Sequence, residues 1–166
     1  MNSVVYPGSF DPITLGHLDI IQRASKIFDK VYVCVLNNSA KKSPLFSPQE
    51  RVNMIGDVVS EYDNVVVASY QGLLVDFARE NGINAILRGL REITDTGIEL
   101  SMAQGNRTVA PDIDTLFMAT DPKLSYISST MVKEFASYGQ SVKDFVPEAL
   151  LDTIENRIRE IRENSL

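Results

Sequence analysis

Five short apolar runs, rich in β-branched residues, alternate along this chain with segments of helical periodicity. The runs cover residues 4–6, 31–36, 65–69, 85–87 and 115–118. Strands that are connected by helices pair in parallel through right-handed crossovers, and a parallel sheet is covered on both faces. The alternation therefore predicts a doubly wound, Rossmann-like α/β fold, with a five-stranded parallel sheet and helices on both faces.

The helical segments are recognised by apolar residues spaced three and four apart. Four such stripes lie between the strands: Ile20, Ile21, Ala24 and Phe28; Val52, Ile55 and Val59; Leu74, Phe77 and Ala78; Ile98, Met102 and Val109. Ser47, Pro48 and Glu50 form the pattern of a capping box, and Asn81-Gly82 is typical of a left-handed helix end. After Pro147, a stripe of Leu150, Ile154, Ile158 and Ile161 predicts a C-terminal packing helix.

Length and composition narrow the class of protein. The 166 residues suit a single domain, 1–166, with a self-sufficient core. A net charge of −6 argues against a nucleic-acid partner, whose phosphates bind basic surfaces. The single cysteine, Cys34, excludes an internal disulfide and a zinc cluster. No apolar run reaches the roughly 18 residues of a membrane span, so we expect no membrane association and a cytoplasmic location.

The first seventeen residues predict a strand, a tight turn and a helix start. Gly8 allows a close approach of the backbone to a ligand, and exposed N–H groups with the helix dipole favour an anion at the helix start. His17, the only histidine, falls in the first turn of that helix. This arrangement indicates a phosphate site.

Polar residues follow each predicted strand, at the edge of the sheet where such folds bind ligands. Lys41, Arg88 and Arg91 follow the second and fourth strands and are candidates for a phosphate clamp. Residues 128–130, Ser-Ser-Thr, are foremost hydroxyl caps of a helix and also a second candidate phosphate cradle. Singly, each of these residues has an ordinary structural explanation, and the functional hypothesis rests on their convergence.

Other reaction classes lose support because their motifs are absent. The sequence contains no Gly-x-Ser-x-Gly elbow, no Gly-x-Gly-x-x-Gly fingerprint and no Walker loop. Acyl transfer, hydride transfer and P-loop hydrolysis are therefore disfavoured. A histidine at a helix start together with Lys and Arg suits attack on phosphorus, where fixed positive donors stabilise the growing charge.

The motifs resemble those of a known superfamily. Residues 6–12, Tyr-Pro-Gly-Ser-Phe-Asp-Pro, with Thr14-x-Gly16-His17, resemble the nucleotidyltransferase signature. Residues 88–91, Arg-Gly-Leu-Arg, and 126–130, Tyr-Ile-Ser-Ser-Thr, are similar to those of bacterial phosphopantetheine adenylyltransferases. The short histidine motif alone would equally fit cytidylyltransferases or nicotinamide-nucleotide adenylyltransferases, and a non-catalytic nucleotide sensor on this fold is a further alternative.

The resemblance implies transfer of the adenylyl group of ATP to 4′-phosphopantetheine, which gives dephospho-coenzyme A and pyrophosphate. It assigns catalysis to His17, Lys41 and Arg91, and acceptor binding to Ser9, Lys41, Leu74 and Arg88, with Met102 and Asn106 beside the acceptor. It assigns ATP binding to Ser9, Phe10, His17, Gly89, Leu90, Arg91, Glu99, Leu124, Ser125, Tyr126, Ile127, Ser128, Ser129 and Thr130. No protein metal ligand is expected, because Mg²⁺ is carried mainly by the ATP phosphates. The resemblance also implies a homohexamer and feedback inhibition by coenzyme A.

Overall fold

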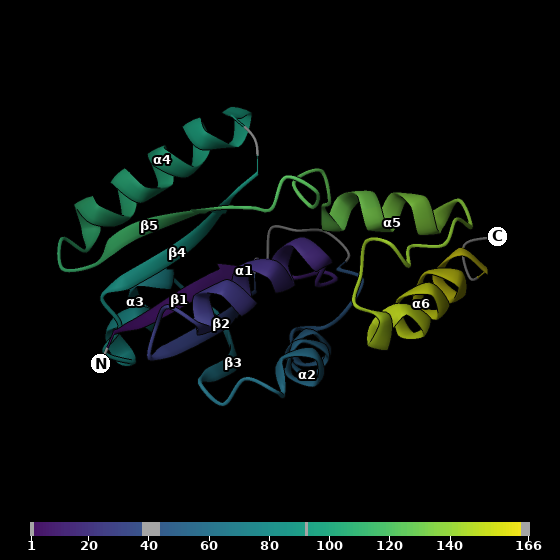
Figure 1. The fold of residues 1–166 in the computed structure, drawn as a ribbon, viewed down its shortest axis with the longest axis horizontal. Helices are drawn as coiled ribbons and strands as arrows, with labels where there is room; N and C mark the ends of the chain where they lie inside the picture. The colour runs from purple at the N-terminus through teal and green to yellow at the C-terminus, as the bar shows by residue number, and fades with distance from the viewer. Residues whose placement is uncertain (1, 38–43, 92, 164–166) are drawn as a thin grey trace.

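The computed structural model describes residues 2–37, 44–91 and 93–163, which form an α/β structure (Figure 1). Its strands are β1 (Ser3–Gly8), β2 (Lys30–Leu36), β3 (Val65–Tyr70), β4 (Ala85–Leu90) and β5 (Asp114–Ala119). Its helices are α1 (Leu15–Ser25), α2 (Pro48–Val59), α3 (Leu74–Glu80), α4 (Ile93–Val109), α5 (Ser129–Ser137) and α6 (Leu151–Glu163), with a short 3₁₀ turn, η1 (Glu148–Leu150), before α6.

All strand pairs of the described residues are parallel, and the strands lie in the order β3-β2-β1-β4-β5. Val4 of β1 lies opposite Val31 of β2, and Val5 lies opposite Ile86 of β4. The chain therefore runs outward from β1 to β3 and then returns to the other side of β1. This confirms the predicted doubly wound sheet and places its switch point at the carboxyl ends of β1 and β4, where such sheets bind ligands.

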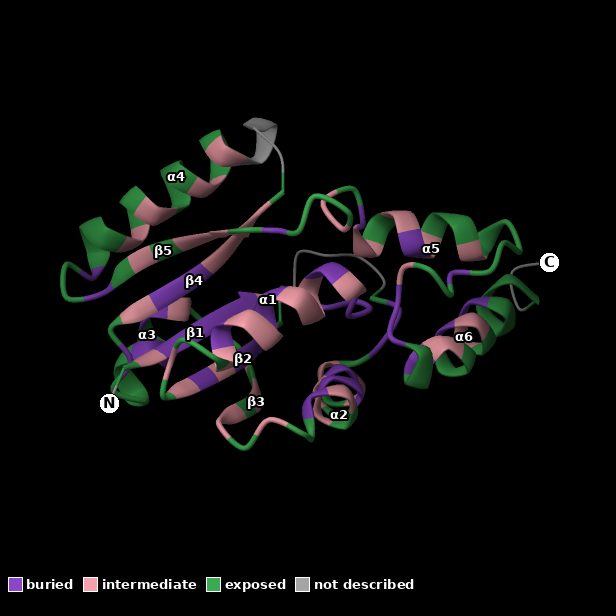
Figure 2. Cartoon of the chain, in the orientation of Figure 1, coloured by how far each residue is buried: buried purple, intermediate pink, exposed green. Residues whose placement is uncertain are grey.

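Helices cover both faces of the sheet. Because neighbouring residues of a strand point to opposite faces, each strand contributes side chains to both sides. Val4 belongs to a core cluster with α1 and α2, whereas Val5 packs in a second cluster with Val75 and Phe77 of α3. Both valines are fully buried, and Figure 2 shows β1 as a buried central strand. Burial on both sides explains why the strand sequences are continuously apolar rather than alternating.

Local capping signals correctly predict the helix ends. Ser47 and Glu50 form the expected capping box of α2, with the Glu50 N–H donating to Ser47 Oγ at 3.2 Å and the Ser47 N–H donating to Glu50 Oε2 at 2.8 Å. Gly82, after α3, has a φ of 65°, the left-handed conformation predicted for the Asn81-Gly82 pair.

Helices α5 and α6 lie side by side beyond the carboxyl ends of the strands (Figure 1). Ile154 and Ile158 of α6 are buried, which confirms the C-terminal packing helix, although Ile161 is 47% exposed. Arg157 of α6 pairs with Glu50 and donates to the Leu45 carbonyl at 2.9 Å. These contacts hold α6 against the start of α2.

The apolar stripe of α4 differs from the expectation of a buried helix face. The helix itself is confirmed, but Ile98, Met102 and Val109 are 71%, 57% and 59% exposed. The reason is the position of α4: it packs on β4 and β5 at the end of the sheet, and no other element of the described residues covers its outer face (Figure 2). Among the described residues, no helix is long and apolar enough to cross a membrane.

Candidate active site

A cavity of about 320 Å³ lies at the switch point of the sheet. Its walls come from the end of β1, the start of α1, the end of β4, α4 and the start of α5. The predicted site residues that line it are Ser9, His17, Arg88, Gly89, Arg91, Glu99, Ile127, Ser128, Ser129 and Thr130. The structure thus brings together residues that are more than a hundred positions apart in the sequence.

His17 is oriented by the cap of α1. Thr14 is the N-cap residue, and its backbone N–H donates to His17 Nδ1 at 3.1 Å. Since a backbone N–H only donates, Nδ1 accepts and the ring proton resides on Nε2. The ring also packs edge-on against Phe10, with centroids 5.0 Å apart.

The His17 imidazole is neutral near pH 7. Removal of the ring from water, together with the nearby positive charge of Arg91, lowers its pKa from 6.5 to about 4. The His17 ring therefore offers an uncharged N–H donor, and it does not gain or lose a proton near neutral pH.

The loop between β1 and α1 has a special backbone conformation at Phe10, whose φ is 46°. The Phe10 ring lies next to Gly8, where a Cβ would come within 2.9 Å of it. Gly8 therefore makes room for Phe10, in addition to the ligand that we predicted from the sequence. Phe10 is 2% exposed and lies behind His17 instead of lining the cavity.

Arg88 and Glu99 form a bidentate ion pair across the cavity. Arg88 Nε donates to Glu99 Oε2 and Nη2 donates to Oε1, both at 2.6 Å. The carboxylate raises the pKa of the Arg88 guanidinium, and the Glu99 side chain is 16% exposed. Two residues predicted to bind different substrates therefore contact each other.

The start of α5 forms the opposite wall. Ser128 is its N-cap and accepts the Met131 N–H at 3.1 Å, and the Ser129 hydroxyl donates to the Pro12 carbonyl at 2.7 Å. Arg91 Nη1 donates to the Ile127 carbonyl at 3.5 Å. Exposed N–H groups, hydroxyls and a guanidinium at one helix start are suited to binding an anion.

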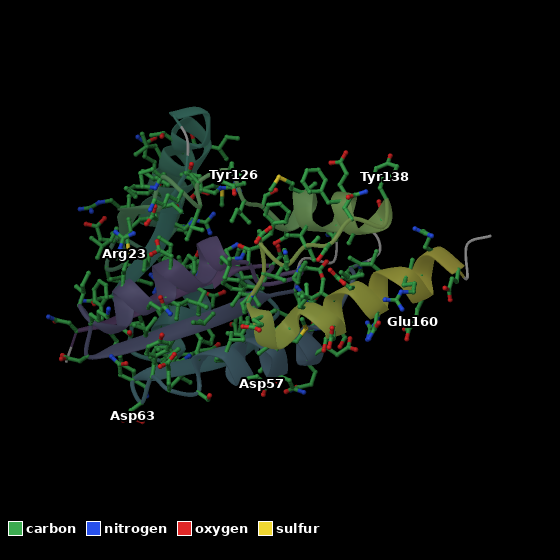
Figure 3. The ribbon with its side chains drawn as sticks, turned by 45° about the vertical axis from the view of Figure 1, so that its right-hand side comes forward. Arg23, Asp57, Asp63, Tyr126, Tyr138 and Glu160 are labelled. Atoms are coloured by element: carbon green, nitrogen blue, oxygen red, sulfur yellow. The ribbon has the colours of Figure 1, made fainter. Side chains whose placement is uncertain are left out.

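Other predicted site residues lie off the cavity walls. Leu74 packs partly buried against the α3 core cluster, and Met102 is exposed on α4, where Asn106 also lies. Leu90, Leu124, Ser125 and Tyr126 lie next to lining residues without lining the cavity, and Tyr126, labelled in Figure 3, is 56% exposed. Lys41 lies outside the described residues.

Several residues that line the cavity have no role predicted from the sequence, among them Tyr6, Asp11, Thr120 and Lys133. Lys133 follows Thr130 by three positions, which places both on one helix face, so a helical projection could have found it. Its Nζ lies 3.3 Å from Asp11 Oδ2. Tyr6 is the first residue of the 6–12 motif and directly precedes Pro7, and burial raises the pKa of its phenol.

The described residues contain no group of three His, Cys, Asp or Glu side chains that could hold a metal ion. The two carboxylates of the cavity, Asp11 and Glu99, are both engaged with cations.

A cavity at the switch point of a doubly wound sheet, with a histidine at one helix start and hydroxyls at another, is typical of nucleotide-binding α/β proteins. Residues 5–135 match the family described as cytidylyltransferase-like. A solved structure from Vibrio parahaemolyticus, assigned as a nicotinate-nucleotide adenylyltransferase, has a similar fold, with a TM-score of 0.70, 15% identity and coverage of 96% of this chain and 97% of that one.

Closer relatives narrow the family. A phosphopantetheine adenylyltransferase of Clostridium perfringens is 50% identical over 95% of this chain and 96% of its own. Proteins of the same name from Natranaerobius thermophilus and Heliobacterium modesticaldum are 49% and 52% identical, over 93% and 91% of this chain and 94% and 89% of their own. The chain belongs to the phosphopantetheine adenylyltransferases within the cytidylyltransferase-like family.

Proposed function

We propose that this protein transfers the adenylyl group of ATP to 4′-phosphopantetheine, producing dephospho-coenzyme A and pyrophosphate. The observation that carries the proposal is the convergence of His17, Arg91 and the start of α5 on one cavity at the switch point. The acceptor phosphate is already anionic, so its oxygen attacks the α-phosphorus without a general base. Catalysis then consists of in-line positioning and charge stabilisation.

His17 acts on the reacting phosphate. Its Nε2–H donates to an oxygen of the α-phosphate and stabilises the charge that develops there as pyrophosphate leaves. The Thr14 N–H on Nδ1 supports this role, because it keeps the ring proton on Nε2. The low pKa keeps the ring neutral over the neutral pH range.

Arg91, together with residues 128–130, holds the leaving phosphates of ATP. The hydroxyls and N–H groups at the start of α5 provide short-range donors, and the guanidinium provides charge. Gly89, Leu90 and residues 124–127 bind the remainder of the nucleotide. Lys41 is proposed as a further catalytic cation on the acceptor side.

Arg88 and Ser9 bind the acceptor phosphate, with Leu74, Met102 and Asn106 along the pantetheine arm. The Glu99 carboxylate occupies the Nε–Nη2 edge of the guanidinium, one of the edges that a bidentate phosphate can use. Binding of the acceptor therefore requires Arg88 to share or exchange this partner, which leaves Glu99 available to ATP.

Mg²⁺ is proposed to be carried by the ATP phosphates, where it would neutralise charge on the triphosphate. The engagement of Asp11 and Glu99 with Lys133 and Arg88 supports this division. We also propose a homohexamer, feedback inhibition by coenzyme A, which shares the pantetheine arm of the acceptor, and a cytoplasmic location. The exposed apolar residues of α4 support assembly.

Pyrophosphate release, measured with separate acceptors, tests the proposal. With ATP present, phosphopantetheine should support turnover, whereas nicotinamide mononucleotide and glycerol 3-phosphate should not. Turnover with either of the other acceptors and not with phosphopantetheine would move the protein to another nucleotidyltransferase activity. ATP binding without turnover on any acceptor would indicate a nucleotide sensor.

A further inference from the structure

Arg51 is a buried cation that contacts the active-site loop from outside the cavity. It lies on α2, is 4% exposed and does not line the cavity. Its Nη1 donates to the backbone carbonyl of Ser9 at 2.6 Å. Ser9 itself lines the cavity, so a single hydrogen bond connects the buried guanidinium to the substrate site.

The other end of the guanidinium is fixed by the start of α2. Arg51 Nε donates to the Ser47 carbonyl at 3.3 Å, and Ser47 is the N-cap residue held by its capping box with Glu50. The planar guanidinium therefore connects two backbone carbonyls, one on a capped helix and one on the loop. Such a fork geometry is available to arginine and not to lysine.

Asp11 restrains the same loop two residues later. Its carboxylate accepts the N–H groups of Leu45 and Phe46 at 3.0 and 2.9 Å and pairs with Lys133. Phe10, between the two anchored residues, has the positive φ that L-residues rarely adopt. A local conformation of this kind persists only when its surroundings determine it.

We propose that Arg51 is a positioning residue for adenylyl transfer, which holds Ser9 and its neighbours in their reactive placement through the Ser9 carbonyl. The inference rests on the proposed function, because Ser9 is placed there at the acceptor phosphate. Burial lowers the pKa of Arg51, and the charge of Asp11 opposes this effect. A buried arginine that served only to fill space would be a costly substitute for an apolar side chain.

Arg51→Met tests the inference, because it keeps an unbranched side chain and removes both hydrogen bonds. In the folded variant, kcat should fall roughly 10- to 100-fold, as expected for misplaced reacting groups, with smaller changes in both KM values. Arg51→Lys keeps the charge and one donor and should retain more activity. It also serves as the test variant if Arg51→Met does not fold.

Arg157→Met is the matched control. Arg157 of α6 also donates to a backbone carbonyl, that of Leu45, and pairs with Glu50 of α2, the helix that carries Arg51. Its hydrogen bonds to the described residues do not include the Ser9 loop. This variant should lose stability and keep its kcat. An equal fall in kcat for Arg157→Met, or an unchanged kcat in folded Arg51→Met, would overturn the inference.

Hydrogen exchange provides a readout that does not depend on activity. Amides of residues 8–11 should exchange faster in Arg51→Met than in the wild-type protein, and should be unchanged in Arg157→Met. A wild-type protein without turnover on phosphopantetheine would refute the proposed function alone. Unchanged exchange at residues 8–11 would refute the role of Arg51 alone.

Discussion

His17 illustrates how one residue can serve the fold and the reaction with different atoms. Nδ1 accepts the Thr14 N–H and completes the capping box of α1, while Nε2 retains the proton for the substrate. A side chain that only caps the helix could be replaced by glutamine, which is common at this position of a capping box. The two functions can therefore be separated by mutation.

His17→Ala is expected to lower turnover by roughly 10² or more, because it removes a donor that acts on transition-state charge. ATP affinity should remain nearly unchanged. His17→Gln should retain the thermal stability of the helix start and still lose turnover. Steady-state kinetics with titration of ATP would measure both effects, and unaltered turnover would remove His17 from its proposed role.

The low pKa of His17 predicts a pH dependence of stability. Between pH 6.5 and about 4, the unfolded chain binds a proton at His17 and the folded protein does not. The free energy of unfolding therefore decreases by roughly 1–3 kcal/mol as the pH falls through this window. Above pH 6.5, His17 is neutral in both states and this loss of stability is absent. Urea denaturation of wild type and His17→Gln should show the difference, and parallel stability curves would contradict the shifted pKa.

Helix α2 fixes the active-site loop through Arg51, and its own start depends on the box of Ser47 and Glu50. Ser47→Ala should destabilise the protein by about 1 kcal/mol, because a helix N–H loses its acceptor. Ser60, an exposed residue at the other end of α2, provides the control, and Ser60→Ala should cost less. Equal midpoints for both variants in urea denaturation would show that the box does not stabilise α2.

The elements of this fold could be predicted from the sequence because their signals are local. Strand runs such as 31–36, the Ser47 capping box and the Asn81-Gly82 helix end each depend on neighbouring residues. The Arg88–Glu99 pair could not be predicted, because its formation depends on how α4 is placed against β4. Arg51 was missed for a similar reason, since its partner Ser9 lies 42 positions away.

In the whole molecule, the exposed apolar stripe of α4, Ile98, Met102 and Val109, is not buried by any described part of the same chain. Ile98 and Val109 are exposed on one helix, and Leu116 is exposed on the adjacent β5. Large exposed apolar patches mark interaction surfaces. Assembly into the proposed hexamer would bury them.

Light scattering should therefore give the mass of six chains for the wild-type protein. Ile98→Glu places a charge on the stripe and should shift the mass toward smaller species, because burial of an unpaired carboxylate is unfavourable. Glu61→Lys, in the turn after α2, is a control at a distant surface. A monomeric wild type, or an unchanged mass of Ile98→Glu, would contradict assembly through α4.

The proposed mechanism is tested most directly by a crystal structure of the protein with ATP and phosphopantetheine bound. We expect the α-phosphate to lie within hydrogen-bonding distance of His17 Nε2, with the terminal phosphates at Arg91 and the start of α5. We also expect the acceptor phosphate beside Arg88 and Ser9. Phosphates bound away from this cavity, or an imidazole turned away from them, would contradict the mechanism.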